Sequence, residues 1–276
     1  MFFELESYEL NSHGVIGIFN TPTARINQES TYDFTLYRGN PDRKIFFNAS
    51  PFNWLEASLF YTSIENKPYI AWKSDYIFKN QSYKDKGFNL KLNLLQETKK
   101  FPSVSIGFND LGGTGLYSSE YIVGTKRINK LDLSLGMGFG KYSDGLKIKN
   151  PFILISNKFR DRAPTSSGEL GLDSFFSGRN ASLFSSVKYA INLNTSFFVE
   201  YDPTKYDEGI KYSFGKNWNS FNFGISHIIN DFYLKYSFVR GSDLIFQISY
   251  KKNNKFFNSN PSYKSIGSEG TTRTAF

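Results

Sequence analysis

The sequence has no cysteine, only two histidines and no long apolar run. The lack of cysteine excludes disulfide frameworks, thiol catalysis and Cys-ligated zinc. With His13 and His227 alone, most histidine-based metal sites are also hard to build. The longest apolar runs, such as residues 152–155, are far shorter than the roughly 20 residues of a transmembrane helix. We therefore expect no metal and no cofactor, and exclude a helical membrane protein. A membrane β-barrel stays possible, because its alternating strands dilute hydropathy.

Aromatic residues are abundant, at 18% of the 276 residues, although the hydrophobic share is only 39%. Disordered chains are poor in aromatics, so we expect a folded protein. Lys and Arg number 33 against 25 Asp and Glu, which gives a formal net charge of +8. This charge is compatible with an anionic partner, but we expect no nucleic acid among the partners.

Apolar and polar residues alternate along most of the chain, and a period of two predicts β-strands. The clearest run is 131–140, where Leu, Met and Phe alternate with Asp, Ser and Gly. No window of similar length repeats with helical spacing, so the chain is predicted to be all-β. About thirteen runs occur, at 32–36, 45–49, 55–61, 88–94, 104–108, 121–127, 131–139, 183–191, 197–201, 210–214, 221–225, 232–238 and 244–250.

The connections between these runs favour a barrel over a soluble β-sandwich. Short turns are expected at 129–130, 192–194, 217–219 and 241–243, and long loops at 65–87, 110–118, 141–180 and 202–209. Outer-membrane barrels combine tight periplasmic turns with long outer loops and an even strand number. Several runs reach about 9–11 residues, which is the length a tilted strand needs to cross a bilayer. We predict an all-β, antiparallel transmembrane β-barrel of the outer-membrane type with about 12 strands, or 14 if residues 14–19 add one.

Alternation also predicts the two faces of the barrel wall. Tyr and Trp near strand ends are expected to form an interfacial girdle, for example Tyr37, Trp54, Tyr61, Tyr117 and Tyr121. Inward aromatic side chains are expected either to stack on sugar rings or to pack a plug, namely Phe46, Phe60, Phe198 and Tyr233. The charged inward face is predicted to comprise Asp33, Glu56, Lys91, Asp132, Lys188, Glu200, Lys211, Lys235 and Lys251. The side chains that we expect to line the lumen or contact a glycan are Lys91, Asp132, Lys188, Glu200, Asp202, Lys211 and Lys235.

Glu200 and Asp202 are a candidate carboxylate pair for glycoside cleavage. They share a strand face, and glycosidases hold two such groups about 5–9.5 Å apart. Glu120 is a candidate third member. In a barrel, such residues more often form ion pairs with Lys or Arg in the lumen, so we predict no catalytic residue and no enzyme. The open alternatives are a soluble glycan-binding protein or glycosidase that uses Glu200 and Asp202, and a general diffusion porin.

An ordered series of segments resembles the bacterial YjbH-type exopolysaccharide biosynthesis family. The series comprises residues 14–25 (GVIGIFNTPTAR), 47–57 (FNASPFNWLEA), 109–121 (NDLGGTGLYSSEY), 175–179, 199–202 and 240–243. It spans roughly residues 14–251, which is most of the chain. The most specific segment is a glycine-rich loop, whose motif residues are Asp110, Gly112, Gly113, Thr114, Gly115, Glu120 and Tyr121.

The resemblance implies an outer-membrane barrel that assists export of an extracellular polysaccharide or capsule without catalysis. It also implies outer-membrane lipids, a polysaccharide that could be anionic, and other export proteins as partners. We expect an N-terminal extension at 1–13, a barrel domain at 14–252 and a polar tail or linker at 253–276. Family members are often longer, so the chain could be one half of a two-barrel protein. No signal peptide is recognisable at residues 1–6, so the expected bacterial outer-membrane location follows from the resemblance.

Overall fold

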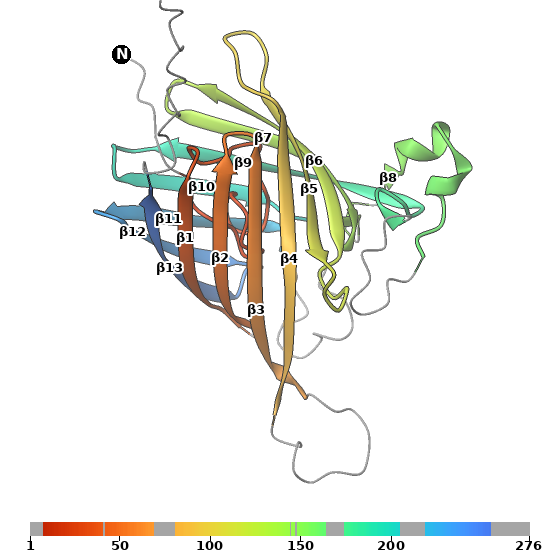
Figure 1. Ribbon diagram of the computed structural model, residues 1–276, viewed down its shortest axis with the longest axis horizontal. Helices are drawn as coiled ribbons and strands as arrows, with labels where there is room; N and C mark the ends of the chain where they lie inside the picture. Colours follow the sequence, from red (N-terminus) through yellow and green to blue (C-terminus); the bar gives the residue numbers. More distant parts are fainter. Residues whose placement is uncertain are drawn as a thin grey trace, which may run out of the picture.

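The computed structural model describes residues 8–40, 42–68, 81–143, 145–146, 148–163, 174–204 and 219–254. Within them the chain forms one antiparallel sheet that curves into a closed barrel (Figure 1). The strands are β1 (Thr31–Arg38), β2 (Asp42–Phe52), β3 (Leu55–Pro68), β4 (Ser82–Leu95), β5 (Ser103–Leu111), β6 (Ser119–Ile128), β7 (Leu131–Gly140), β8 (Ile148–Lys149), β9 (Asn180–Ala190), β10 (Thr195–Tyr201), β11 (Phe221–Ile229), β12 (Phe232–Val239) and β13 (Asp243–Asn253). Three short 3-10 helices are η2 (Lys141–Ser143), η3 (Pro151–Leu154) and η4 (Asn157–Phe159).

Twelve of these strands close the barrel, in agreement with the predicted number. Each strand pairs with its sequence neighbours, β7 pairs with β9, and β13 returns to pair with β1. The two-residue β8 only extends the end of β9 and is not part of the closed ring. Every predicted run among the described residues matches one strand, and the run at 210–214 lies outside them.

The connections at the two ends of the barrel differ in length, largely as predicted. We call the turn end the one at which residues 53–54, 96–102, 129–130, 191–194 and 230–231 reverse the chain. The loop end carries the connections 112–118, 141–179 and 202–220, but it also carries the short turn between β12 and β13 that was predicted at 241–243. One predicted loop is too long: β3 and β4 continue to Pro68 and from Ser82, because cross-strand pairs such as Ile64–Tyr83 extend their ladder.

The wall is polar inside and apolar outside, which follows from the alternation in the strands. In β3, Ser58 and Phe60 face inward and are 2% and 7% exposed, whereas Leu59 between them is 58% exposed. The outward face carries many large apolar side chains, including Phe34, Leu36, Phe47, Leu135, Phe223, Phe246 and Tyr250.

Two sequence expectations need correction. Residues 14–19 form no barrel strand but lie inside the barrel, where the ring already closes with twelve strands. Of the expected girdle, Trp54 and Tyr61 are exposed on the outer face, whereas Tyr37, Tyr117 and Tyr121 are buried. Their rings fill the space over inward glycines and beside the N-terminal segment, which outweighs the interfacial preference of tyrosine. For example, a Cβ on Gly107 would lie 2.1 Å from Tyr121 Cζ.

The predicted domain boundaries remain predictions. The first barrel strand begins at Thr31, and the last one ends at Asn253. Residues 255–276, which include most of the expected tail, lie outside the described residues.

Candidate functional site

Residues 8–30 fold inside the barrel, and we call them the plug. Nearly all side chains from Leu10 to Ala24 are buried. The segment doubles back on itself through isolated bridges between Leu10 and Ile16 and between Gly17 and Pro22. It is the red coil that passes behind β2 and β3 (Figure 1). The lumen of the barrel is therefore occupied by the chain itself.

Short polar side chains shape the plug locally. The Asn11 side-chain oxygen accepts hydrogen bonds from the backbone N–H groups of His13 and Val15, at 3.0 and 3.2 Å, and so forms a tight turn. Gly14 in this turn has a φ of +84°, and a Cβ there would lie 2.4 Å from the Phe46 ring. The turn thus requires a glycine both for its left-handed backbone and for its close approach to the wall.

One wall carboxylate, that of Glu200 in β10, binds three consecutive plug residues. Its oxygens accept hydrogen bonds from the N–H groups of Phe19, Asn20 and Thr21, at 3.0, 2.9 and 3.0 Å. The Thr21 hydroxyl donates a further bond at 2.8 Å. Buried backbone N–H groups outside regular structure need such partners, and a charged acceptor strengthens each bond.

A buried ion pair on neighbouring strands binds both backbone polar groups of a single plug residue. Lys91 Nζ of β4 lies 2.5 Å from Glu56 Oε2 of β3. The other oxygen of Glu56 accepts the N–H of Ile16 at 2.6 Å, and Lys91 donates to the Ile16 carbonyl at 3.0 Å. Both charges are fully buried and both polar groups of Ile16 are satisfied, so the pair fixes the position of the plug.

Other wall cations bind plug carbonyl groups. The plug has two arms, one before and one after its turn at Asn11 and Gly14. Lys235 of β12 donates to the carbonyls of Leu10 and Ile18, and so joins the two arms. Lys44 of β2 donates to the carbonyl of Ser12 at 3.1 Å. Both lysines are buried, and the plug carbonyls replace the solvation that burial removes.

Ion pairs hold both ends of the plug. Lys188 of β9 lies 2.7 Å from Glu9 Oε2, and Arg25 contacts both oxygens of Asp132 of β7, at 2.5 and 3.1 Å. Burial by itself would raise the pKa of Glu9, but the charges of Lys188 and Lys235 outweigh it and lower the pKa to about 2. Glu9 therefore stays ionised while the plug is seated.

The described residues among those predicted to line the lumen all contact the plug. Lys91, Asp132, Lys188, Glu200, Asp202 and Lys235 bind plug atoms, and Lys211 lies outside the described residues. The sequence alone does not show that these residues share one partner, the plug. The signal was present in the many small and polar residues of 11–23, but their alternation is too short to show where they lie.

The carboxylates proposed as an enzymatic pair are engaged by the plug. The Asn20 side chain donates to Asp202 at 2.7 Å, beside the bonds that Asn20 and its neighbours make to Glu200. Burial and the charge of Glu200 raise the pKa of Asp202, which follows the last residue of β10, to about 6. Glu120 is not part of this group, because it lies on β6, three strands away in the ring.

The glycine-rich motif forms a compact loop rather than an exposed ligand site. Asp110, the last residue but one of β5, has a φ of +58°, and its carboxylate accepts the N–H of Tyr117 at 2.9 Å. Gly112 and Gly115 also have positive φ, and a Cβ on Gly113 would lie 1.8 Å from the Asp110 carboxylate. Thr114 completes the loop between them. The motif residues are thus used to fold the connection from β5 to β6.

The last two motif residues anchor neighbouring parts of the structure. Glu120 binds Arg162 through two bonds of 2.7 Å and accepts the N–H of Phe176 at 3.0 Å, which fastens the long connection after β7. Tyr121 is fully buried, and its ring lies edge-on to Tyr142 and Phe184. Segments that carry the family resemblance therefore meet in space: 109–121 meets 175–179, and 14–25 meets both 47–57 and 199–202.

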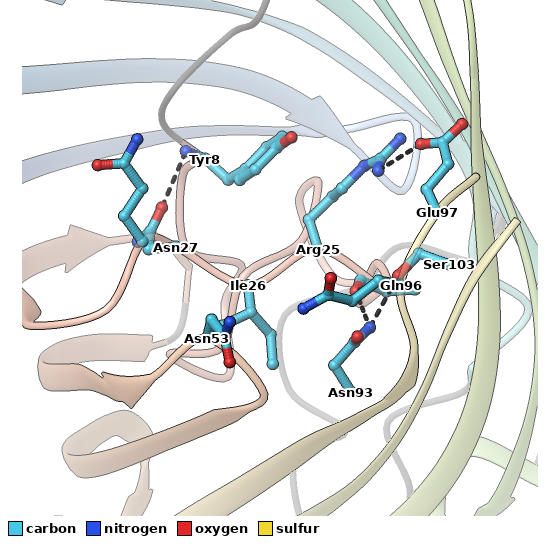
Figure 2. Close-up of a pocket in the computed structure, with 11 residues that line it drawn as sticks. Tyr8, Arg25, Ile26, Asn27, Asn53, Asn93, Gln96, Glu97 and Ser103 are labelled. Atoms are coloured by element: carbon cyan, nitrogen blue, oxygen red, sulfur yellow. Dashed lines mark hydrogen bonds and ion pairs between the residues drawn. The ribbon is translucent and has the colours of Figure 1, made fainter. Parts of the chain in front are cut away.

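A polar cavity of about 410 Å³ lies where both ends of the plug meet the turns of the barrel. Figure 2 shows Tyr8, Arg25 and Glu97 on one side, with Asn53, Gln96 and Asn93 opposite. Arg25 reaches Glu97 at 2.6 Å, and its guanidinium lies 5.8 Å from the centre of the Tyr8 ring. The cavity was not predicted from the sequence, because its residues come from segments that are distant along the chain.

Two features are absent from the described residues. These residues contain no group of three or more His, Asp or Glu side chains placed to hold a metal ion. Nor does any helix among them have the length and apolar character to span a membrane.

The fold and the lumen together define a class: a closed 12-stranded antiparallel β-barrel whose lumen is filled by its own N-terminal segment. The chain belongs to the YjbH family, described as exopolysaccharide biosynthesis protein YbjH, which matches residues 9–271. It is 32% identical over 256 residues to a protein of Escherichia coli (strain K12) named uncharacterized lipoprotein YjbH. That match covers 91% of this chain and 36% of the relative, so the chain spans about a third of that protein's length.

Solved structures of similar shape include two porins. The KdgM porin has a TM-score of 0.42 at 10% identity, over 81% of this chain and 99% of the porin. The NanC porin has a TM-score of 0.35 at 10% identity, over 81% of this chain and 98% of the porin.

Proposed function

We propose that the protein is an outer-membrane β-barrel that assists the biosynthesis or export of an extracellular polysaccharide without catalysing a reaction, and that its plug closes the lumen at rest. Membership in an exopolysaccharide biosynthesis family supports the pathway. The observation that carries the closed state is the plug itself, whose backbone is bound by Glu200, Glu56, Lys91 and Lys235.

The apolar outer face supports the membrane location. Large side chains such as Phe47, Leu59 and Phe223 lie exposed around the wall, and water-exposed apolar surface of this extent is rare in soluble proteins. In outer-membrane barrels the short turns face the periplasm and the long loops face outward. We therefore place the turn end, with the cavity, at the periplasmic side. The further partners that we propose are outer-membrane lipids and other export proteins.

The filled lumen weighs against the alternative functions. A diffusion porin needs an aqueous channel, whereas the plug occupies this space. A glycosidase needs carboxylates that reach a sugar, whereas Glu200 and Asp202 are buried under plug bonds. The lumen lysines bind plug carbonyls or, for Lys188, the Glu9 carboxylate, so an anionic polysaccharide would meet them only after the plug moves. We therefore propose an anionic polysaccharide as cargo only for the state in which the plug has moved out of the lumen.

The proposal is tested by secretion. Cells that lack the protein are expected to release less extracellular polysaccharide, and the wild-type chain in its full-length context should restore release. The Glu200→Gln variant should restore it too, because the proposal assigns no catalysis to this carboxylate and the amide oxygen still accepts hydrogen bonds from the plug. Unchanged secretion without the protein would contradict the role in export. Release of reducing ends by the purified wild-type protein, but not by Glu200→Gln, would instead establish an enzyme.

A further inference from the structure

The cavity at the turn end is lined by polar side chains from three separate segments of the chain. Gln28, Asn53 and Gln96 line it, and their solvent-exposed side-chain amides have no hydrogen-bond partner among the described residues. They belong to the plug, to the β2–β3 turn and to the β4–β5 turn, respectively. Each amide offers a carbonyl acceptor and two N–H donors. Three separate segments therefore bring solvent-accessible donors and acceptors to the lining of one space.

The charged side chains around the cavity already form ion pairs with one another, and Arg127 joins them at 3.3 Å from Asp132. Arg25 lies 2.6 Å from Glu97 and 2.5 Å from Asp132, and Lys126 lies 3.1 Å from the other oxygen of Glu97. The Arg25 side chain is only 10% exposed. A charged ligand would have to compete with these ion pairs, whereas an uncharged ligand would not.

We propose that this cavity binds an uncharged sugar unit of the polysaccharide. The volume of about 410 Å³ falls in the range of small-molecule sites, about 300–1,000 Å³. Sugar hydroxyls both donate and accept hydrogen bonds, as do the three free amides. The Tyr8 ring and the Ile26 side chain supply the apolar surface that the C–H face of a sugar ring requires. The inference rests on the proposed function and names its ligand class at the periplasmic end.

Ligand-observed NMR on the purified full chain tests the proposal. The chain is held in a zwitterionic detergent, because alkyl-glycoside detergents would compete for the site. The probes are neutral trisaccharides built from glucose, galactose or mannose, together with an acidic oligogalacturonate. We expect saturation transfer to at least one neutral probe, and weaker or no transfer to the acidic one.

A double variant and its control locate the binding. Asn53→Ala with Gln96→Ala should weaken the binding of the neutral probe about tenfold, since two hydrogen-bonding groups are lost. Asn194→Ala removes an exposed amide from a different turn of the same end and should leave binding unchanged. No transfer to any neutral probe, preference for the acidic probe, or equal binding by the double variant would overturn the proposal.

The outcome is separable from that of the proposed function. If the protein restores polysaccharide secretion but binds no neutral probe, the sugar site falls and the export role stands. If it binds the probe at this cavity but its loss leaves secretion unchanged, the export role falls instead.

Discussion

At the scale of single residues, a few buried charged side chains of the wall hold the plug in the lumen. Glu200 alone satisfies three consecutive backbone N–H groups, and Lys235 joins carbonyls from both arms. The inward orientation of these residues was predictable, because alternation decides which face a side chain occupies. Their partner was not predictable, because Glu200 and Thr21 are 179 positions apart and no local pattern links them.

Replacement of Glu200 by alanine should loosen the plug. The change leaves three N–H groups without their charged acceptor, which we expect to cost about 3 kcal/mol of plug binding. The chain has no cysteine, so Ser12→Cys, at a buried plug position, gives a clean reporter. In the Glu200→Ala background, maleimide labelling of this reporter should become about a hundredfold faster. Glu65→Ala is the matched control, because Glu65 forms an exposed ion pair with Arg43; equal labelling in both backgrounds would contradict the account.

Acidification should favour release of the plug through His13. Burial and the charge of Lys44 lower the pKa of this plug residue to about 3, whereas a released His13 returns to about 6.5. Below pH 6.5, His13 is protonated when the plug is released but stays neutral when the plug is bound in the lumen. The free energy that favours the bound plug therefore decreases as the pH falls. At pH 5 the loss is about 2 kcal/mol.

A histidine variant separates this effect from its neighbours. Glu9 acts in the same direction but only between about pH 4.5 and 2, since its pKa is lowered to about 2. Asp202 acts in the opposite direction between about pH 6 and 4, since its pKa is raised to about 6. In planar bilayers, the ratio of open events at pH 5 to those at pH 7 should therefore be smaller for His13→Gln than for the wild type. Identical ratios would exclude His13 as the titrating group.

At the scale of elements, the strands were predictable and the plug was not. A strand such as β7 has one face toward the lumen and one toward the outside, so its polar and apolar residues alternate. Residues 131–140 were therefore identified correctly as a strand. The plug has no regular period, because each of its residues binds a different wall side chain. The inward glycines lie between these cases: the period of two places Gly136 and Gly138 on the inner face, but it does not show that the rings of Phe184 and Tyr142 fill the space beside them.

A methyl group at Gly136 should therefore disturb the wall. An added Cβ would lie 2.1 Å from Phe184 Cζ, and the ring is held beside Tyr121 and Tyr142. We expect Gly136→Ala to lower stability by about 1–3 kcal/mol, as overpacking does. Gly124→Ala is the control, because the nearest atoms are 3.9 Å away. Folded and boiled samples compared on a gel give the folded fraction; Gly136→Ala should reduce it, and adding Phe184→Leu should recover part. Equal folded fractions for both alanine variants would contradict this packing.

At the scale of the whole molecule, the ring of twelve strands leaves no open edge, and the plug removes the open channel. The barrel thus presents an apolar wall outside, a filled lumen, and a polar cavity at the end where both arms of the plug emerge. The class of fold followed from the sequence, because strand alternation and unequal connections are local signals. The closed lumen is a long-range property, and it required the arrangement of the whole chain.

Conductance across a planar lipid bilayer tests the central claim most directly. At pH 7, the wild-type barrel should insert without a steady ionic current, because the plug fills its lumen. The Glu56→Ala and Glu200→Ala double variant should show frequent open steps, because both carboxylates that bind the plug backbone are lost. A steady current through the wild type, equal to that of the double variant, would contradict a plugged barrel.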